Sequence, residues 1–181
     1  MSRLTLIAAL LVSALALVAA GCGGDDESSN AIPADEWADE FCTAVSSWTD
    51  NLQQIRDRFT DLSSLNEDAL NEAADDAGSA TDEFVNDLKD LGRPDTESGQ
   101  EIEDSLQTLE DTVEQEKIDV EDTVNNVEDL SDIPAAITAI GSALSSMGTA
   151  LQSTFDAIRN EDVGGELKTA VDQSEACQGV F

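Results

Sequence analysis

Apolar residues recur every three or four positions along most of the chain, which is the period of an α-helix with one buried face. The clearest example follows Pro33, a residue that is tolerated in the first turn of a helix. Its apolar positions are Trp37, Phe41, Val45, Trp48, Leu52, Ile55, Phe59 and Leu62. This spacing predicts one long helix with a single apolar face.

Two further apolar stripes predict a second and a third helix. The second begins after Asn66, a preferred N-cap type, and ends at Gly92, which Pro94 follows. The third is interrupted by charge at Glu116 and Lys117, where fraying or a local kink is expected. The two stripes are Leu70, Ala74, Ala77, Phe84, Leu88 and Leu91, and then Ile102, Leu106, Leu109, Val113, Val120, Val124 and Val127.

The fourth helix is predicted to begin near Pro134, and a short final helix is predicted over residues 166–176. The fourth stripe is Ile137, Ile140, Leu144, Met147, Leu151, Phe155 and Ile158. No segment alternates with a period of two and tyrosine is absent, so a sheet is not expected. Short loops between long helices favour antiparallel neighbours. Residues 33–181 are therefore expected to be all-α, an antiparallel up-down four-helix bundle with a short extra C-terminal helix.

Residues 1–21 have the composition of a signal peptide. Arg3 is the only charge before Asp25, and the apolar run 4–20 follows it. This run of about 17 residues is at the lower limit for a membrane span, and no basic flank follows it. A retained anchor helix therefore fits less well than cleavage and export.

The end of this segment, residues 17–22 with the sequence Leu-Val-Ala-Ala-Gly-Cys, resembles the lipobox of bacterial lipoproteins. The resemblance implies cleavage before Cys22, acylation of its thiol, and an anchor on the extracytoplasmic face of the cell membrane. Ala20 and Gly21 match the motif, whereas Ala19 stands where the family usually has leucine. Ordinary cleavage after Ala20 also fits, and it would leave Cys22 as a free thiol.

Residues 22–32 are small and polar after the cysteine and lack an apolar period, so they are expected to form a flexible acidic tether. Ten extended residues reach at most about 35 Å. The remainder of the chain is only loosely similar to uncharacterised small actinobacterial lipoproteins. That likeness implies no activity.

The chain has three cysteines. Assigning Cys22 to the lipid leaves Cys42 and Cys177 as an even pair, and an extracytoplasmic location permits a disulfide between them. In an up-down bundle the first helix starts at the end where the last helix finishes, so the two can meet. Two unrelated buried thiols are the alternative.

All 40 acidic residues lie after Cys22, and the mature chain keeps seven basic ones, which gives a formal charge of −33. Such a surface repels nucleic acid and anionic lipid headgroups. The acids are spread over all the helices, as in a solvated surface. A specific Ca²⁺ site is the alternative. The best candidate is an EF-hand-like loop that begins with residues 160–165, but its twelfth position is Val171, where an EF-hand has glutamate.

The chain contains no histidine, which removes the usual general base, most catalytic zinc sites and the common haem ligand. Paired carboxylates still permit glycoside hydrolysis in principle. However, Trp37 and Trp48 lie on the apolar face and are expected as core anchors rather than as a platform for a ligand. No catalytic residue, metal ligand or cofactor is predicted, and the chain is not expected to be an enzyme.

Residues 133–155 carry no charge in this otherwise acidic chain. The segment is expected to be too polar to span a membrane. The small residues Gly141, Ser145 and Gly148 lie along one side, and they predict close packing of the fourth helix against its neighbours. An exposed neutral face on which a partner helix docks is the alternative.

These observations predict a lipid-anchored, non-enzymatic lipoprotein that acts in the cell envelope by binding or spacing. Its expected partners are the membrane, through the lipid on Cys22, and another envelope protein. The alternative is an extracytoplasmic protein that binds a cation or a small ligand with its acidic side chains.

Overall fold

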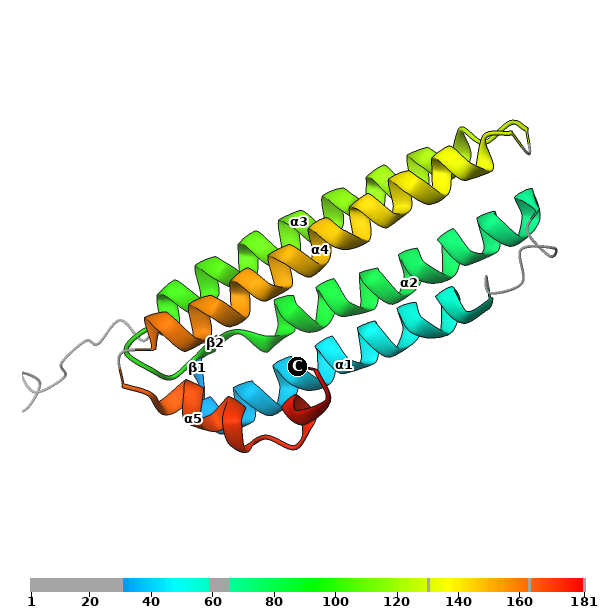
Figure 1. The fold of residues 1–181 in the computed structure, drawn as a ribbon. Helices are drawn as coiled ribbons and strands as arrows, with labels where there is room; N and C mark the ends of the chain where they lie inside the picture. The colour runs from blue at the N-terminus through cyan, green and yellow to red at the C-terminus, as the bar shows by residue number, and fades with distance from the viewer. Residues whose placement is uncertain (1–30, 59–65, 130, 163, 181) are drawn as a thin grey trace, which may run out of the picture.

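The computed structural model describes residues 31–58, 66–129, 131–162 and 164–180, and most of them are helical (Figure 1). The prediction of an all-α fold is therefore confirmed. The elements are α1 (Ala34–Arg58), α2 (Glu67–Leu91), α3 (Gly99–Asn125), α4 (Ile133–Glu161) and α5 (Glu166–Gln173), followed by a 3-10 helix (Ala176–Gly179). Positions 59 and 62 of the first stripe lie outside the described residues.

The signals that bound α2 act as predicted. The side chain of Asn66 accepts a hydrogen bond of 2.9 Å from the backbone N–H of Ala69, which satisfies one free donor of the first turn. At the other end, Gly92 has a φ of 68°, a conformation that costs glycine little and other residues more. The polypeptide therefore leaves the helix at this glycine.

The expectation that no sheet would form is wrong for four residues. β1 (Ala31–Ile32), which was assigned to the tether, pairs in parallel with β2 (Arg93–Pro94). The turn after β2 is tight, since a Cβ atom at Gly99 would collide with the carbonyl oxygen of Pro94. Pairs of two residues carry no periodicity, so the apolar pattern could not reveal them.

The expected break in the third helix is also wrong. α3 continues as an α-helix through Glu116 and Lys117. The Lys117 ammonium lies 2.6 Å from a carboxylate oxygen of Asp82 on α2 and 3.5 Å from one of Glu121. The charge in the apolar stripe is thus compensated by neighbouring acids, and the helix does not need to distort.

The four long helices lie side by side, and consecutive ones run in opposite directions (Figure 1). α3 packs most extensively against α4, α1 against α2, and α2 against α3. α5 and the 3-10 helix cover the first part of α1. α1 and α4 meet at Phe41 and Phe155, whose ring centroids lie 5.2 Å apart.

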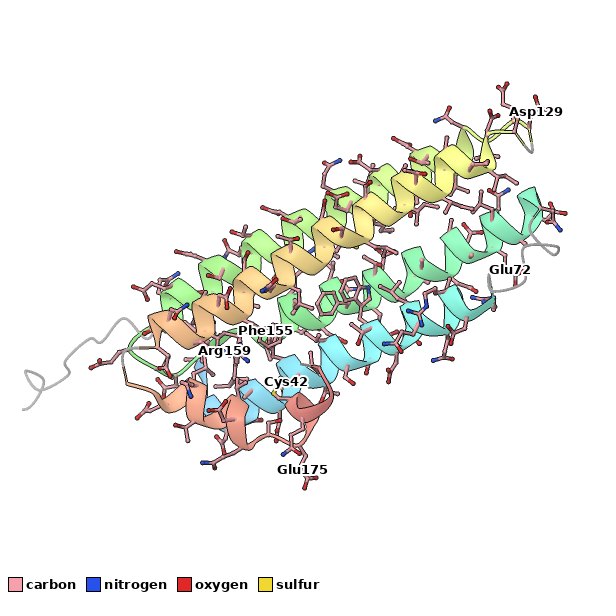
Figure 2. All side chains as sticks on the ribbon, in the orientation of Figure 1. Cys42, Glu72, Asp129, Phe155, Arg159 and Glu175 are labelled. Carbon is pink, nitrogen blue, oxygen red and sulfur yellow. A yellow bond between two sulfur atoms is a disulfide. The ribbon has the colours of Figure 1, made fainter. Side chains whose placement is uncertain are left out.

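The disulfide between Cys42 and Cys177 is present, as predicted (Figure 2). It joins the 3-10 helix to α1 across a sequence separation of 135 residues. Trp37 and Trp48 are core residues, also as predicted, with 0% and 4% of their surfaces exposed. The indole N–H of Trp37 donates to the carbonyl of Gly92, which fixes the end of α2 against α1.

The buried apolar residues form two clusters. The larger cluster contains both tryptophans, most of the α3 stripe and the disulfide. The smaller one lies at the opposite end, around the turn between α3 and α4, and comprises Leu70, Val124, Val127, Ile133 and Ala136. The core is therefore divided along the length of the helices.

Candidate functional site: an apolar pocket between the four long helices

A pocket of about 340 Å³ lies in the half of the molecule away from the disulfide. All four long helices contribute to its walls. The lining residues are Leu52, Ile55, Arg56, Leu70, Ala73, Ala74, Ala77, Gly78, Thr81, Lys117, Val120, Glu121, Ile137, Ile140, Gly141, Leu144 and Met147. Its volume is within the usual range for small-molecule sites, and its walls are mainly apolar.

Residues of the two core clusters close the ends of the pocket. At the inner end, Met147 and Thr81 are each 3% exposed. The Thr81 hydroxyl accepts a hydrogen bond of 3.2 Å from the indole N–H of Trp48, whose ring stacks on Phe84. At the outer end, Leu70 belongs to the smaller cluster. The pocket thus occupies the interval between two packed regions.

The pocket exists because α2 carries small residues on its inward face there. Ala73, Ala74, Ala77 and Gly78 all line it, whereas one to three turns further along the same helix the buried positions hold Phe84 and larger aliphatic side chains. Small side chains cannot fill the space between helix axes that are 8 to 10 Å apart. The same helical period therefore produces a filled core at one end and a cavity at the other.

The mouth of the pocket lies beside α4. Ile137 and Leu144 line the pocket and are nevertheless 45% and 44% exposed. Arg56, near the end of α1, also lines it, and 73% of its side chain is exposed. An apolar ligand could therefore enter between the last turn of α1 and the first half of α4.

The charged groups of the pocket wall are already paired. The hydrogen bond to Asp82 is the main cause that holds the pKa of Lys117 above its usual value, so this side chain stays cationic at neutral pH. Its ammonium is shared with Glu121, and the Arg56 guanidinium lies 3.1 Å from Asp57. The wall therefore offers paired charges rather than a free acid, base or nucleophile.

The prediction that small residues pack α4 closely against its neighbours is wrong at both glycines. A Cβ atom added at Gly141 or at Gly148 would have no atom of a neighbouring helix within 4 Å. These positions face open space, and much of the first half of α4 is exposed. The structure therefore has the exposed neutral face that was the alternative.

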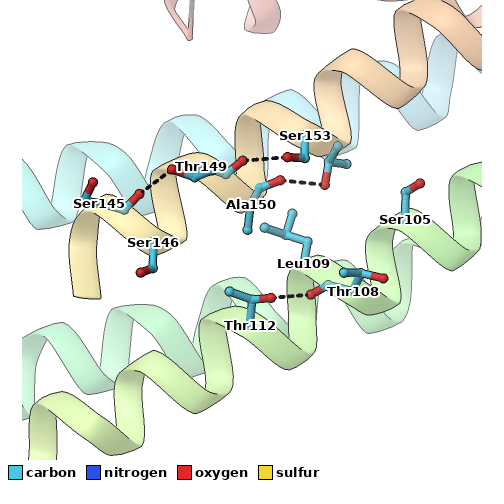
Figure 3. A pocket seen from close by; sticks show the side chains of 10 residues that line it. Ser105, Thr108, Leu109, Thr112, Ser145, Ser146, Thr149, Ala150 and Ser153 are labelled. Carbon is cyan, nitrogen blue, oxygen red and sulfur yellow. Dashed lines mark hydrogen bonds between the residues drawn. The ribbon is translucent and has the colours of Figure 1, made fainter. Parts of the chain in front are cut away.

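A second hollow lies between α3 and α4 (Figure 3). Its volume is about 490 Å³, and hydroxyl side chains dominate its walls. Most of these hydroxyls donate to the carbonyl four residues earlier in their own helix; Thr108 donates to Asp104 and Thr149 to Ser145. Because their protons are committed to the backbone, this groove has the character of a solvated helix surface.

The other predicted sites fall in different places. Cys22 lies outside the described residues. In the candidate calcium loop, the Asp162 side chain accepts from the backbone N–H of Lys168 and so serves the start of α5. Within the described ranges, no three acidic or cysteine side chains are grouped closely enough to hold a metal ion. The acidic side chains there do not assemble a cation site.

α4 also bears on the membrane question. Over Ile133–Asn160 it is long and apolar enough to cross a membrane by length and composition, which corrects the expectation that it is too polar. Core helices of soluble proteins meet the same criterion.

Comparisons with protein-family models, with curated proteins and with solved structures found no match to this chain. The fold and the site themselves define the class: a helical protein with an apolar pocket between its helices. The periodicity did not reveal the pocket, because it marks which positions are apolar and not how large they are. The available signal was the set of small residues at positions 73, 74, 77 and 78, on one face of a helix, together with the uncharged segment 133–155.

Proposed function

We propose that this protein is a lipid-anchored, extracytoplasmic and non-enzymatic binding protein that holds an apolar small molecule between its four long helices. The observation that carries the proposal is the pocket of about 340 Å³ with its exposed apolar mouth. Apolar walls offer water few hydrogen bonds, so an apolar ligand that enters leaves water and displaces only weakly held solvent. The ligand would thus be held by the apolar interior and not by the acidic surface.

The proposal includes a closed up-down four-helix bundle, with α4 returning beside α1. The packing of α1 on α2, of α2 on α3 and of α3 on α4 supports it, as does the contact between Phe41 and Phe155. A pocket that draws lining residues from all four helices also fits this arrangement. The absence of histidine from the sequence supports a non-enzymatic role.

Saturable binding of an uncharged solvatochromic dye tests the pocket. Gly141 lines the mouth and Gly148 does not, yet both have room for a larger side chain. Gly141→Leu should weaken dye binding at least tenfold by filling the mouth, and Gly148→Leu should leave it unchanged. Equal binding by the two variants would show that the dye does not use the pocket.

The lipid anchor rests on the lipobox-like residues 17–22. Mass spectrometry of the native protein should show an N-terminal peptide that begins at Cys22 and carries a diacylglyceryl group. An unmodified N-terminal peptide, or a leader that is still attached, would contradict the anchor.

A second candidate function is docking of an envelope protein on the uncharged face of α4. The observation that favours it is the open space at Gly141 and Gly148 on a helix with no charge between residues 133 and 155. Cross-linking in intact cells should then capture one protein whose yield falls when Gly148→Glu introduces a charge. An unchanged yield would contradict docking at this face.

A further inference from the structure

We infer that the pocket takes a single hydrocarbon chain carrying an uncharged polar head group, as in a monoacylglycerol. This inference rests on the proposed function and adds the chemical class of the ligand. It follows from three properties of the pocket: its shape, the position of its mouth and the charges at its wall.

The shape favours a chain over a compact ring system. The lining extends along α4 from Ile137 to Met147 and along α2 from Leu70 to Thr81. At 1.5 Å per residue these segments are about 15 Å long. A volume of about 340 Å³ spread over this length describes a narrow, elongated space. An extended alkyl chain fills such a space along the helix direction.

The position of the mouth explains why the ligand needs a polar end. Solvent reaches the pocket beside Ile137, Leu144 and Arg56, whereas buried residues close the inner end at Met147. The mouth runs along the side of the pocket from Ile137 to Leu144. A chain whose tip lies near Met147 therefore has its first carbons toward Ile137 and Arg56, at the surface. Whatever group begins the chain remains in contact with water and has to be hydrated.

The charges at the wall select against a charged head group. Arg56 pairs with Asp57, and Lys117 pairs with Asp82 and Glu121. These acids already offset the charges of Arg56 and Lys117, so a carboxylate or phosphate head gains little from them within a chain of formal charge −33 after processing. A cationic head would be repelled by the Arg56 guanidinium and the Lys117 ammonium, which both line the pocket. An uncharged head disturbs none of these pairs.

The test uses the exported, lipid-anchored chain reconstituted in phosphatidylcholine nanodiscs. A monoacylglycerol with a diazirine near the chain end is irradiated, and the labelled peptides are identified by mass spectrometry. The label should appear on the α2 and α4 segments that line the pocket. Gly141→Leu should reduce it at least tenfold, whereas the matched variant Gly148→Leu should not change it.

Competition identifies the head group. Unlabelled monoacylglycerol should displace the probe at least tenfold better than the fatty acid or the alkylamine of equal chain length. Each methylene added to the competitor should improve displacement about fourfold until the pocket is full. Better displacement by the charged analogues would overturn the uncharged head and leave the apolar pocket as a binding site.

The remaining outcomes concern the occupant. If neither this probe nor the solvatochromic dye reaches the pocket, both the ligand class and the proposed function are wrong. If the probe labels only a Cys22→Ser chain, the anchor's own acyl group fills the pocket and the inference of a separate ligand is wrong.

Discussion

The two ends of the molecule are built from the same four helices and differ in the size of the side chains between them. At the disulfide end, Trp37, Phe41 and Val45 of α1 are fully buried. At the other end, Leu52 and Ile55 continue the same stripe but remain partly exposed around the pocket. The disulfide end is therefore a packed core that stabilises the fold, whereas the other end contains the pocket.

The two ends also differ in the interactions that stabilise them: one has a covalent cross-link, and the described residues of the other have only non-covalent contacts. The disulfide and α5 lie at the filled end, where α1 is covered by the C-terminal segment. The pocket end is held by the small cluster around Leu70 and by ion pairs such as that of Arg58 with Asp76. Exposed ion pairs contribute little to stability, so the pocket end should open more readily than the disulfide end.

The largest effect is expected from removing the disulfide. The chain-entropy model gives roughly 5 kcal/mol as an upper figure for closing a loop of this length. The double variant Cys42→Ser, Cys177→Ser should therefore lose several kcal/mol in the free energy of unfolding, as measured in urea. The wild-type protein with reductant should show the same loss. A change below about 1 kcal/mol would mean that packing alone holds the C-terminal segment on α1.

Two leucine truncations test the comparison directly. Leu109 in α3 is 1% exposed, and Leu144 at the pocket mouth is 44% exposed. Leu109→Ala should cost about 3 to 5 kcal/mol, since it opens a cavity in a filled core. Leu144→Ala should cost about 1 kcal/mol or less, because its side chain is only partly removed from water. Similar losses in urea denaturation would show that the two ends are packed alike.

The sequence predicted the elements of this fold better than its interior. The spacing of Trp37, Phe41 and Val45 marked a buried face, and Asn66 and Gly92 marked the ends of α2. These are local signals, which a single segment contains by itself. The pocket depends on the sizes of residues from four helices at one level, and that arrangement is known only once the helices are placed.

Local signals also misled where the outcome depends on a distant partner. The charge at Lys117 indicated a broken helix, yet Asp82 on α2 compensates it. Gly141 and Gly148 indicated close packing, yet no neighbouring atom approaches them. A lysine in an apolar stripe can be paired or unpaired, and a glycine in a helix can be packed or exposed. Which of these occurs depends on the neighbouring helix and not on the residue itself.

The open space on α4 leads to a stabilising prediction. Glycine within a helix costs about 0.5 to 1 kcal/mol relative to alanine, and a Cβ at Gly141 or Gly148 meets nothing. Gly141→Ala and Gly148→Ala should each raise the free energy of unfolding by about that amount. Gly99→Ala is the control, and it should lower the stability because its Cβ would collide with Pro94. Destabilisation by the α4 variants would mean that this face is covered.

The smallest effect concerns the ion pair beside the pocket. The hydrogen bond to Asp82 raises the pKa of Lys117 above its usual 10.5. A raised pKa in the folded state contributes stability that is fully present below pH 10.5 and is lost as the pH rises through the folded-state pKa. Urea denaturation between pH 8 and about pH 11.5 should therefore show a decline in the free energy of unfolding of the wild-type protein, and Asp82→Asn should make this decline shallower.

The control is Asp90→Asn, which removes the same charge two turns further along α2, away from Lys117, and should leave the decline unchanged. If both variants lower the stability equally at every pH, the pair between α2 and α3 does not hold this wall of the pocket.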